Sequence, residues 1–435
     1  MSSLISSKID QVNRNIISSD NALASLIRAE RDGYSLSREF YCDEDIFHSD
    51  MERIVGKKWL LIDHVSRIPE QGQYFVYDIA DDSIIIVRES KNKVNAFYNV
   101  CRHRGSVICT EKEGKRNSLV CPYHSWTYKL DGTLLAARSM PEDFDYTENA
   151  LHSCHIKIHH GFIFINLDQN APVDFESEFS QFEEQLIFHG FSGAKVATRA
   201  SYPTAANWKL VVENFIECYH CASAHPEFSS LHPRDALIAC GGGANSGSGE
   251  AAERFKPLHE AWEVKAREMG RPIGICDDDE FSTHLKMFLS RPHNQGILSE
   301  TQDGQPAAGL MGKRTEFDRG RMHMSFGPLN HIIACNDFAA LIIFTPRGVK
   351  DTDVEVIWIV DEKTEYVDED KIRWLWDTTT IQDKTIVENN QRGINSTRCV
   401  PGRFSEQEKR VATFKKWYLN NLALASVHPK IAKFG

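Results

Sequence analysis

Apolar residues in the first part of the chain fall into short runs of strand length. Residues 1–33 are polar with helical spacing, which predicts a helical arm rather than a core segment. Between residues 34 and 170, β-rich runs alternate with Gly, Asp and Asn turns, as in a β domain. The predicted strands lie at residues 72–80, 83–90, 94–100, 117–124, 127–135 and 161–167.

The pattern becomes mixed after residues 170–179, which we interpret as a linker. The predicted helices lie at residues 208–222, 258–268 and 368–392, and the predicted strands at 331–345 and 354–360. The last helix starts with acidic residues and is expected to stop at Gly393. A Gly/Ser loop at residues 241–250 is either a mobile lid or a surface insertion. The chain is therefore predicted to be α+β, with domains at 34–170 and 171–435.

Composition narrows the classes of function. A length of 435 residues agrees with two domains, and a formal net charge of −11 argues against binding to nucleic acid. The chain has no run of 18 apolar residues, and its N-terminus lacks the profile of a signal peptide. We therefore expect a cytoplasmic protein without a membrane span. In that reducing compartment the 11 cysteines are expected to be thiols or metal ligands rather than disulfides.

Two mixed Cys–His pairs lie within the stretch "CRHRGSVICTEKEGKRNSLVCPYHSW". Cys101 and His103 form a C-x-H pair, and Cys121 and His124 form a C-x-x-H pair. A structural zinc site is the competing interpretation, but zinc fingers pair Cys with Cys and His with His. Mixed pairs favour a Rieske [2Fe–2S] cluster, in which one iron takes both Cys and the other takes both His. Cys109 breaks the pairing and is interpreted as a buried structural thiol.

A second group of ligands lies in "NWKLVVENFIECYHCASAHPE". Glu217 and His220 are three residues apart and would share a helix face. His225 precedes Pro226, which disfavours helical geometry there and lets His225 turn back toward His220. With one further carboxylate, the two histidines would form the facial triad of a mononuclear Fe(II) site. The alternatives are a core histidine network, and zinc or thiol chemistry at the overlapping C-x-x-C, residues 218–221.

The predicted helix 368–392 supplies candidates for that carboxylate. Asp377, Asp383 and Glu388 all lie on it, and periodicity does not choose among them. A Rieske site alone indicates an electron carrier, whereas a second metal site indicates an enzyme.

The two motifs, in this order, resemble those of the oxygenase (alpha) subunits of Rieske non-haem iron oxygenases. The resemblance covers nearly the whole chain and implies a Rieske domain followed by a helix-grip domain with an antiparallel sheet. It also implies that the two mixed pairs bind the cluster and that His220 and His225 bind the mononuclear iron. The family's carboxylate ligand follows a Gln, which selects Asp383, and Asn214 falls where the family keeps an Asn beside the iron.

One position departs from most of the family. Most members carry Asp where this chain has Glu217, and that carboxylate joins an iron-ligating His to a cluster His, here His124, of a neighbouring subunit in a trimer. Glu at this position resembles the branch that acts on quaternary ammonium compounds. The resemblance implies a monooxygenase component that uses O2 and electrons from an NAD(P)H-dependent flavin/ferredoxin reductase. It would hydroxylate an N-methyl group of a glycine betaine-like compound and release formaldehyde.

Two rival functions stay open on the sequence. One is an aromatic-ring hydroxylating (di)oxygenase alpha subunit, and the other is a non-catalytic Rieske electron-transfer protein.

A quaternary ammonium group would be held by aromatic faces, and Arg321 or Arg347 would meet a substrate carboxylate. The aromatic candidates are Phe215, Tyr219, Phe326, Phe338, Phe344 and Trp358.

Overall fold

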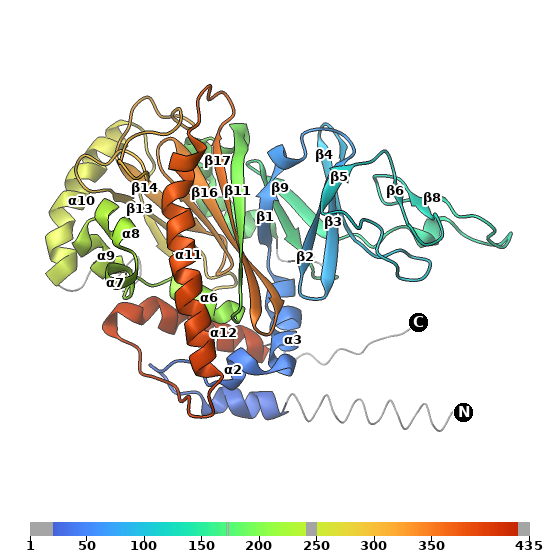
Figure 1. Cartoon of the computed structure of the whole chain (residues 1–435), viewed down its shortest axis with the longest axis horizontal. Coiled ribbons are helices and arrows are strands. Elements are labelled where there is room, and N and C mark those ends of the chain that lie inside the picture. The colour runs from blue at the N-terminus through green and yellow to red at the C-terminus, as the bar shows by residue number, and fades with distance from the viewer. Residues whose placement is uncertain (1–20, 171, 173, 241–249, 425–435) are drawn as a thin grey trace.

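The computed structural model describes residues 21–170, 172, 174–240 and 250–424. The chain has two lobes: a β-rich lobe on the right of Figure 1 and a larger α+β lobe on the left. Residues 21–29 are helical, as predicted for the arm, whereas residues 1–20 lie outside the described residues. Two helices, α2 (Glu39–Cys42) and α3 (Glu44–Arg53), follow below the larger lobe.

Short antiparallel strands build the β-rich lobe. They form three sheets with the orders β4-β3-β2-β5, β6-β7-β8 and β1-β10-β9. The strands predicted at 72–80, 83–90, 94–100 and 161–167 are present. The strand predicted at 117–124 is only two residues long, and the one predicted at 127–135 was wrong, because this segment is two strands joined by a turn. The strands are β1 (Leu60–His64), β2 (Gln73–Ile79), β3 (Asp82–Ser90), β4 (Lys93–Tyr98), β5 (Glu113–Lys115), β6 (Leu119–Val120), β7 (Thr127–Tyr128), β8 (Leu134–Ala136), β9 (His155–His159) and β10 (Phe162–Asn166).

A seven-stranded antiparallel sheet with the order β11-β17-β16-β15-β14-β13-β12 forms the centre of the larger lobe. Its strands are β11 (Ala194–Thr204), β12 (Ile275–Asp277), β13 (Met287–Pro292), β14 (Gly320–Ser325), β15 (Asn330–Ala334), β16 (Phe338–Gly348) and β17 (Asp351–Asp361). The long helix α11 (Glu369–Ile394) crosses the sheet (Figure 1). The α+β class, with an antiparallel second sheet, is confirmed. Among the described residues, no helix is both long and apolar enough to span a membrane.

Further helices surround this sheet. They are α4 (Phe175–Phe179), α5 (Glu183–His189), α6 (Trp208–Phe215), α7 (Cys221–Ala224), α8 (Pro226–Leu231), α9 (Arg234–Cys240), α10 (Glu250–Glu268) and α12 (Lys409–Leu424). The predicted helix 258–268 is the second half of α10, which continues through Pro257. The loop predicted at 241–250 lies outside the described residues except for its last residue.

Three sequence predictions of this region were wrong. The predicted strand 331–345 is two strands, β15 and β16, joined by a turn. Helix α11 passes through Gly393 and ends at Ile394. The supposed linker 170–179 contains α4, whose Phe175 and Phe179 are buried in an aromatic core cluster, so this segment packs rather than merely connects.

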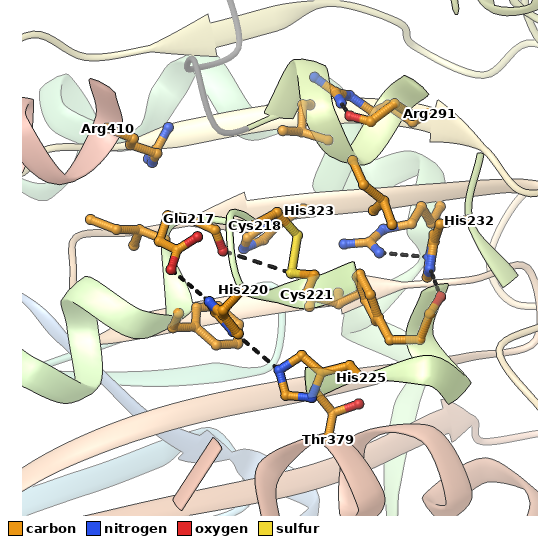
Figure 2. Close-up of a pocket in the computed structure, with 18 of the residues that line it drawn as sticks. Glu217, Cys218, His220, Cys221, His225, His232, Arg291, His323, Thr379 and Arg410 are labelled. Carbon is orange, nitrogen blue, oxygen red and sulfur yellow. Dashed lines mark hydrogen bonds and ion pairs between the residues drawn. A yellow bond between two sulfur atoms is a disulfide. The ribbon is translucent and has the colours of Figure 1, made fainter. Parts of the chain in front are cut away.

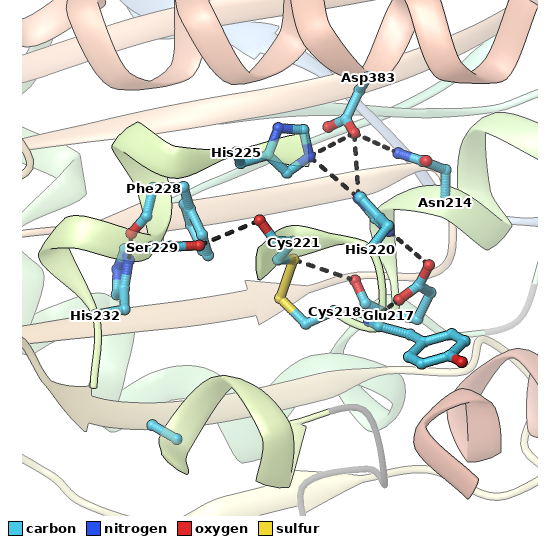
Figure 3. Close-up of a disulfide and its surroundings, with 12 residues drawn as sticks. Asn214, Glu217, Cys218, His220, Cys221, His225, Phe228, Ser229, His232 and Asp383 are labelled. Atoms are coloured by element: carbon cyan, nitrogen blue, oxygen red, sulfur yellow. Dashed lines mark hydrogen bonds and ion pairs between the residues drawn. A yellow bond between two sulfur atoms is a disulfide. The ribbon is translucent and has the colours of Figure 1, made fainter. Parts of the chain in front are cut away.

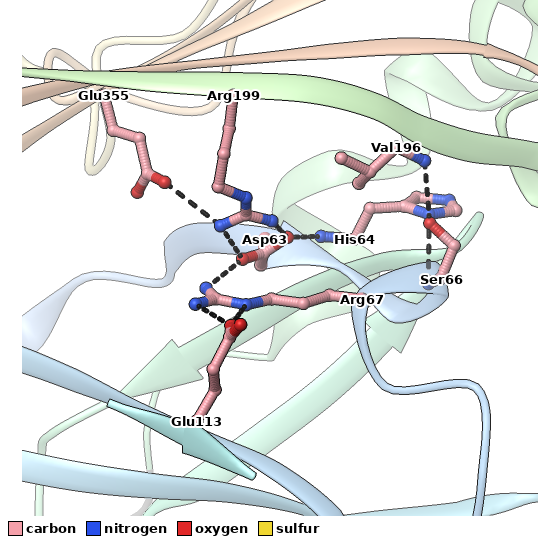
Figure 4. A network of polar contacts seen from close by, with 8 residues as sticks. All are labelled: Asp63, His64, Ser66, Arg67, Glu113, Val196, Arg199 and Glu355. Atoms are coloured by element: carbon pink, nitrogen blue, oxygen red, sulfur yellow. Dashed lines mark hydrogen bonds and ion pairs between the residues drawn. The ribbon is translucent and has the colours of Figure 1, made fainter. Parts of the chain in front are cut away.

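A buried carboxylate joins the two lobes (Figure 4). Asp63, at the end region of β1, is fully buried and pairs with Arg67 at 2.6 Å and with Arg199 of β11 at 3.0 Å. Arg67 also contacts Glu113 of β5 at 3.0 Å, and Arg199 contacts Glu355 of β17 at 3.0 Å. The network therefore ties a strand of the β-rich lobe to two strands of the larger sheet.

Candidate metal centres and the pocket beside the histidine pair

The helix predicted at 208–222 is broken where the candidate ligands lie. Helix α6 starts after Asn207, whose side chain accepts a hydrogen bond from the Lys209 amide, and it ends at Phe215. Residues 216–220 form an irregular turn before α7. Glu217 and His220 therefore do not share a helix face, although His220 Nδ1 lies 2.6 Å from Glu217 Oε1.

Three side chains from separate elements meet beside this turn (Figure 3). His220 precedes α7 and His225 follows it, while Asp383 comes from α11. The Nε2 atoms of His220 and His225 are 3.1 Å apart, and they lie 3.4 and 2.9 Å from Asp383 Oδ1. Asn214 of α6 donates to the same Asp383 oxygen at 2.7 Å. Two imidazoles and one carboxylate are the donor set of a mononuclear non-haem iron site.

Outer contacts aim both imidazoles at the common centre. Glu217 accepts the Nδ1 hydrogen of His220, and the Gln382 carbonyl oxygen accepts that of His225 at 2.7 Å. Each ring therefore keeps its Nε2 lone pair free for a metal. Gln382 is held in turn by a 2.9 Å bond to Glu227. Sequence reasoning used Gln382 only as a neighbour of Asp383 and did not assign it this role.

The electrostatics of this centre favour a positive charge. Burial lowers the pKa of His220, but its bonds to Asp383 and Glu217 outweigh burial and raise the pKa to about 9. Burial likewise opposes ionisation of Asp383, yet the contacts with both histidines lower the pKa of this carboxyl. A divalent iron would satisfy the same three donors and supply that positive charge.

The other two acidic candidates of α11 are engaged elsewhere. Asp377 contacts the Tyr202 hydroxyl and pairs with Arg373 at 3.1 Å. Glu388 pairs with Lys384 at 2.7 Å and accepts from a backbone amide of the 205–207 loop. The structure therefore brings Asp383, and neither alternative, to the histidine pair.

The cysteines of the C-x-x-C form a disulfide, Cys218–Cys221 (Figure 3). The expectation that no cysteine would be disulfide-bonded was wrong for this pair. Both residues line the pocket described below, and the bond ties the turn before His220 to the first residue of α7. Because the sulfurs are joined to each other, they do not compete with the histidines for a metal. Cys109 is a buried free thiol, as expected.

Two matching loops hold the candidate cluster ligands. In the first, the Gly105 amide donates to the Cys101 carbonyl; in the second, the Ser125 amide donates to the Cys121 carbonyl. Gly105 and Ser125 both have left-handed backbone conformations, with φ of 73° and 59°. The first loop therefore turns back two residues after His103, and the second turns back one residue after His124.

The four donors are arranged in two layers. Cys101 and Cys121 are buried free thiols, whereas His103 and His124 are exposed. The two histidine Nδ1 atoms are 3.1 Å apart, and the Trp126 ring stacks on His103 with centroids 4.8 Å apart. Buried thiols beneath exposed imidazoles fit a cluster with one thiolate-bound iron inside and one imidazole-bound iron near solvent.

A pocket of about 110 Å³ opens beside the histidine pair (Figure 2). Its lining includes the triad, the disulfide, apolar side chains of β13 and β15, and the arginines Arg291, Arg321 and Arg410. Thr379, one turn before Asp383 on α11, also lines it and has a buried hydroxyl without a hydrogen-bond partner among the described residues.

The pocket contains few of the predicted aromatic residues. Phe215 lines it, Phe344 lines a smaller neighbouring cavity, and Tyr219 is exposed. The remaining three candidates are packed in the core; they are Phe326, Phe338 and Trp358. Sequence reasoning missed Phe228 and Trp376, which line the pocket with ring centroids 5.8 Å apart. Arg321 lies in the pocket wall, whereas Arg347 pairs with Asp353 elsewhere.

Comparison with known families agrees with both centres. Residues 58–153 match the Rieske [2Fe-2S] domain, and residues 191–424 match the catalytic domain of the ring hydroxylating alpha subunit. The chain belongs to the Rieske oxygenase alpha-subunit family. It is an oxidoreductase with a Rieske cluster and a mononuclear iron. The rival interpretation as a non-catalytic electron-transfer protein does not fit a match to a catalytic domain.

Relatives place the chain within this family. It is 35% identical to the glycine betaine monooxygenase oxygenase subunit of Pseudomonas aeruginosa (strain UCBPP-PA14), over 94% of each chain. It is also 35% identical to the carnitine monooxygenase oxygenase subunit of Acinetobacter pittii, over 45% of this chain and 54% of that one. A solved quaternary ammonium Rieske monooxygenase, described with carnitine oxidation and inter-subunit electron transfer, matches with a TM-score of 0.65. That match has 22% identity and covers 92% of this chain and 97% of the other.

Proposed function

We propose that this chain is the terminal oxygenase component of a monooxygenase that removes an N-methyl group from a quaternary ammonium compound of the glycine betaine type. The observation that carries this proposal is the His–His–Asp triad in the wall of a pocket that also has aromatic and arginine side chains. The 35% identity to glycine betaine monooxygenase over nearly the full length supports the substrate class.

The proposed assignment of residues follows from their donors. His220, His225 and Asp383 hold the mononuclear iron, and Asn214 fixes the Asp383 oxygen by its 2.7 Å hydrogen bond. Cys101 and Cys121 hold the inner iron of the cluster, and His103 and His124 hold the outer one. When bound, the cluster supplies single electrons and the mononuclear iron supplies the site of O2 reduction and C–H hydroxylation.

The overall reaction balances without a further reactant. One N-methyl cation, O2, NAD(P)H and a proton give an N-hydroxymethyl cation, NAD(P)+ and water. The C–N bond of that product then breaks, with release of formaldehyde, the tertiary amine and a proton. The aromatic faces of Phe215, Phe228 and Trp376 provide the pocket with π surfaces that attract a cation lacking hydrogen-bond donors.

Electron delivery involves other chains. We infer a homotrimer in which Glu217 accepts a hydrogen bond from His220 and another from His124 of a neighbouring subunit, and an NAD(P)H-dependent flavin/ferredoxin reductase as the electron donor. Exposure of His124 supports contact with a second chain. We propose a cytoplasmic location because reduced nicotinamide cofactors are held there.

A substrate panel tests the function. The purified chain, a generic ferredoxin-type reductase and NADH are incubated with glycine betaine, carnitine, choline and proline betaine, and with naphthalene as an arene. Formaldehyde in proportion to substrate-dependent NADH oxidation is expected with a methylated amine. A diol from the arene without formaldehyde from any amine would contradict the proposal and favour the ring-hydroxylating alternative. Iron analysis should give about three irons per chain, two for the cluster and one for the triad.

A further inference from the structure

A buried ionic cluster lies in the pocket wall, apart from the triad. Glu300 is fully buried, and its Oε1 lies 3.2 Å from His232 Nε2, 3.3 Å from His293 Nε2 and 3.5 Å from Arg321 Nη1. Its other oxygen accepts a hydrogen bond from Trp376 Nε1 at 2.8 Å. Burial opposes ionisation of Glu300, but the charge of the nearby Arg321 lowers the pKa of this carboxyl well below the ordinary value. The carboxylate is therefore charged.

This cluster is built to hold an arginine rather than a metal. His232, His293 and Glu300 have the spacing of a metal site, yet Arg321 Nη1 donates to His232 Nε2 at 2.7 Å. His232 Nε2 is therefore a hydrogen-bond acceptor whose lone pair is not available to a metal. His232 Nδ1 donates to the Phe228 carbonyl at 2.7 Å. Burial, followed by the charge of Arg321, lowers the pKa of His232 to about 4 and keeps it neutral. The guanidinium is the cation of this site.

Arg321 also faces the pocket. Its Nη1 is fixed by His232, whereas its Nε and Nη2 have no hydrogen-bond partner among the described residues. Arg291 is its direct cross-strand partner in the β13–β14 pair and lines the same pocket. Like charges opposite each other on two strands repel, and the Glu300 carboxylate offsets the charge of Arg321 only, so a further anion beside the two arginines is favoured. The pair therefore favours an anionic group at this end of the pocket.

The anionic subsite is separated from the triad by two helical turns. Trp376 lies seven residues before Asp383 on α11, which is about 10 Å of helix rise. His225 and His232 flank α8 on opposite ends. Figure 2 shows Arg291 and His232 well apart from His220 and His225 across the pocket. One end of the pocket thus holds the proposed iron ligands, and the other end holds two guanidinium groups.

We propose that Arg321, with Arg291 opposite it, binds a carboxylate of the substrate, and that Glu300 is the positioning residue that holds Arg321 in place. This inference rests on the proposed function and deepens it. The substrate is then a zwitterion, with its methylammonium group at the triad and its carboxylate, several bonds away, at the two arginines. A choline-like cation has the methyl groups but lacks the second contact.

A matched pair of substrates isolates this contact. Glycine betaine and its methyl ester share the methylammonium group, and only the first has a carboxylate charge. The readout is the preference, the ratio of kcat/KM for betaine to kcat/KM for the ester. Arg321→Met is expected to lower the preference roughly 10- to 100-fold, mainly through KM for betaine, because charge-assisted hydrogen bonds are lost. Arg347→Met is the control, since Arg347 pairs with Asp353 at 2.8 Å away from the pocket, and it should keep the wild-type preference.

A second pair of variants tests the positioning role. Glu300→Gln keeps the shape of the side chain but removes the charge that holds Arg321, so its preference should fall in the same direction. Arg321→Lys should recover part of the preference that Arg321→Met loses. Cluster absorbance and iron content are measured on each variant to show that it is folded and loaded. If Glu300→Gln does not fold, the Met and Lys variants of Arg321 still decide the carboxylate contact.

The outcomes separate this inference from the proposed function. An unchanged preference in loaded Arg321→Met would overturn the carboxylate contact even if wild type releases formaldehyde. If wild type releases no formaldehyde from any methylated amine, the proposed function fails. Calorimetric titration of the loaded wild-type and Arg321→Met proteins with betaine and its ester then tests the subsite alone: tighter betaine binding that depends on Arg321 supports it, and no such dependence overturns it.

Discussion

Both carboxylate oxygens of Glu217 are engaged within its own chain. One accepts from His220 Nδ1 at 2.6 Å, and the other contacts the Tyr219 backbone amide. These contacts hold the Glu217 side chain in the turn after α6, where 12% of its surface is exposed. Glu217 therefore orients the His220 ring, and its remaining exposed edge is available to a second protein chain.

The variant Glu217→Gln separates orientation from metal binding. Its amide oxygen can still accept the His220 hydrogen, so both metals should stay bound. The lost charge removes the proposed link to a neighbouring His124, and turnover should fall roughly 100-fold. Formaldehyde release and metal content are measured together, and Glu217→Asp, which keeps the charge, should retain part of the activity. Wild-type turnover in a metal-replete Glu217→Gln protein would contradict this role.

Among the secondary-structure elements, α6 also carries a partly buried carboxyl group, that of Glu213. The Tyr41 hydroxyl of α2 donates to Glu213 at 2.9 Å and so joins the N-terminal helices to the catalytic lobe. Burial raises the pKa of Glu213 to about 7. The folded state therefore binds a proton that the unfolded chain releases near its ordinary value of 4.5.

This shift predicts a pH dependence of stability. The contribution of Glu213 is fully present below pH 4.5 and is lost as pH rises through 7, because the buried group must then ionise. Glu213→Gln cannot ionise and therefore does not lose this stability as the pH rises. Its stability relative to wild type should rise by on the order of 3 kcal/mol between pH 4.5 and pH 8. Thermal unfolding of the loaded proteins checks this, and the exposed Glu39→Gln in α2 should show no such trend.

Local sequence signals predicted the strands of the first lobe well, because Gly, Asp and Asn turns separate them. They failed at the 335–337 turn between β15 and β16, although Asn336 and Asp337 are turn-forming residues of the same kind. That turn is fixed by distant partners: Asp337 accepts from Ser299 at 2.6 Å and from the Ala307 amide at 2.8 Å. The apolar runs on both sides of this Asn–Asp pair were predicted as one strand, because the pair was not interpreted as a turn and its long-range bonds leave no periodic mark in the sequence.

The candidate site also has a part that the sequence predicted, the metal ligands, and a part that it did not, the pocket wall. Spacing and the family resemblance pointed to the ligands that the structure brings together, because these residues lie in short motifs. The pocket wall was mostly missed, since Phe228, Trp376 and Glu300 come from three distant segments and meet only in the fold. The break in the helix after Phe215 was missed as well, because residues 216–220 contain no Gly or Pro to mark it.

For the whole molecule, the junction between the lobes depends on Asp63. Replacing Asp63 with Ala leaves Arg67 and Arg199 without their buried carboxylate and should cost about 3–5 kcal/mol of stability. Asp353→Ala, which removes a partly exposed partner of Arg347, should cost about 1 kcal/mol or less. Thermal unfolding of the two loaded variants compares them. Equal effects would show that the network does not hold the lobes together.

A complementation experiment tests whether the unit of function is larger than one chain. Glu217→Gln keeps its cluster ligands, and His124→Ala keeps Glu217 and its triad. Each variant alone should be inactive. The two variants are co-expressed with different tags and purified on both tags. In the proposed ring trimer, each mixed assembly has one His124→Ala chain that receives electrons from the intact cluster of a Glu217→Gln neighbour. Activity should therefore return to about one third of the wild-type kcat.

The control for complementation combines Glu217→Gln with His220→Ala, in which both chains are damaged on the same side of the proposed contact. That mixture should stay inactive in every arrangement. If electrons moved only within one chain, the first mixture would be equally inactive, because neither of its chains has both an intact cluster site and Glu217. Recovery in the first mixture and not in the second therefore requires that His124 of one chain serve Glu217 of another.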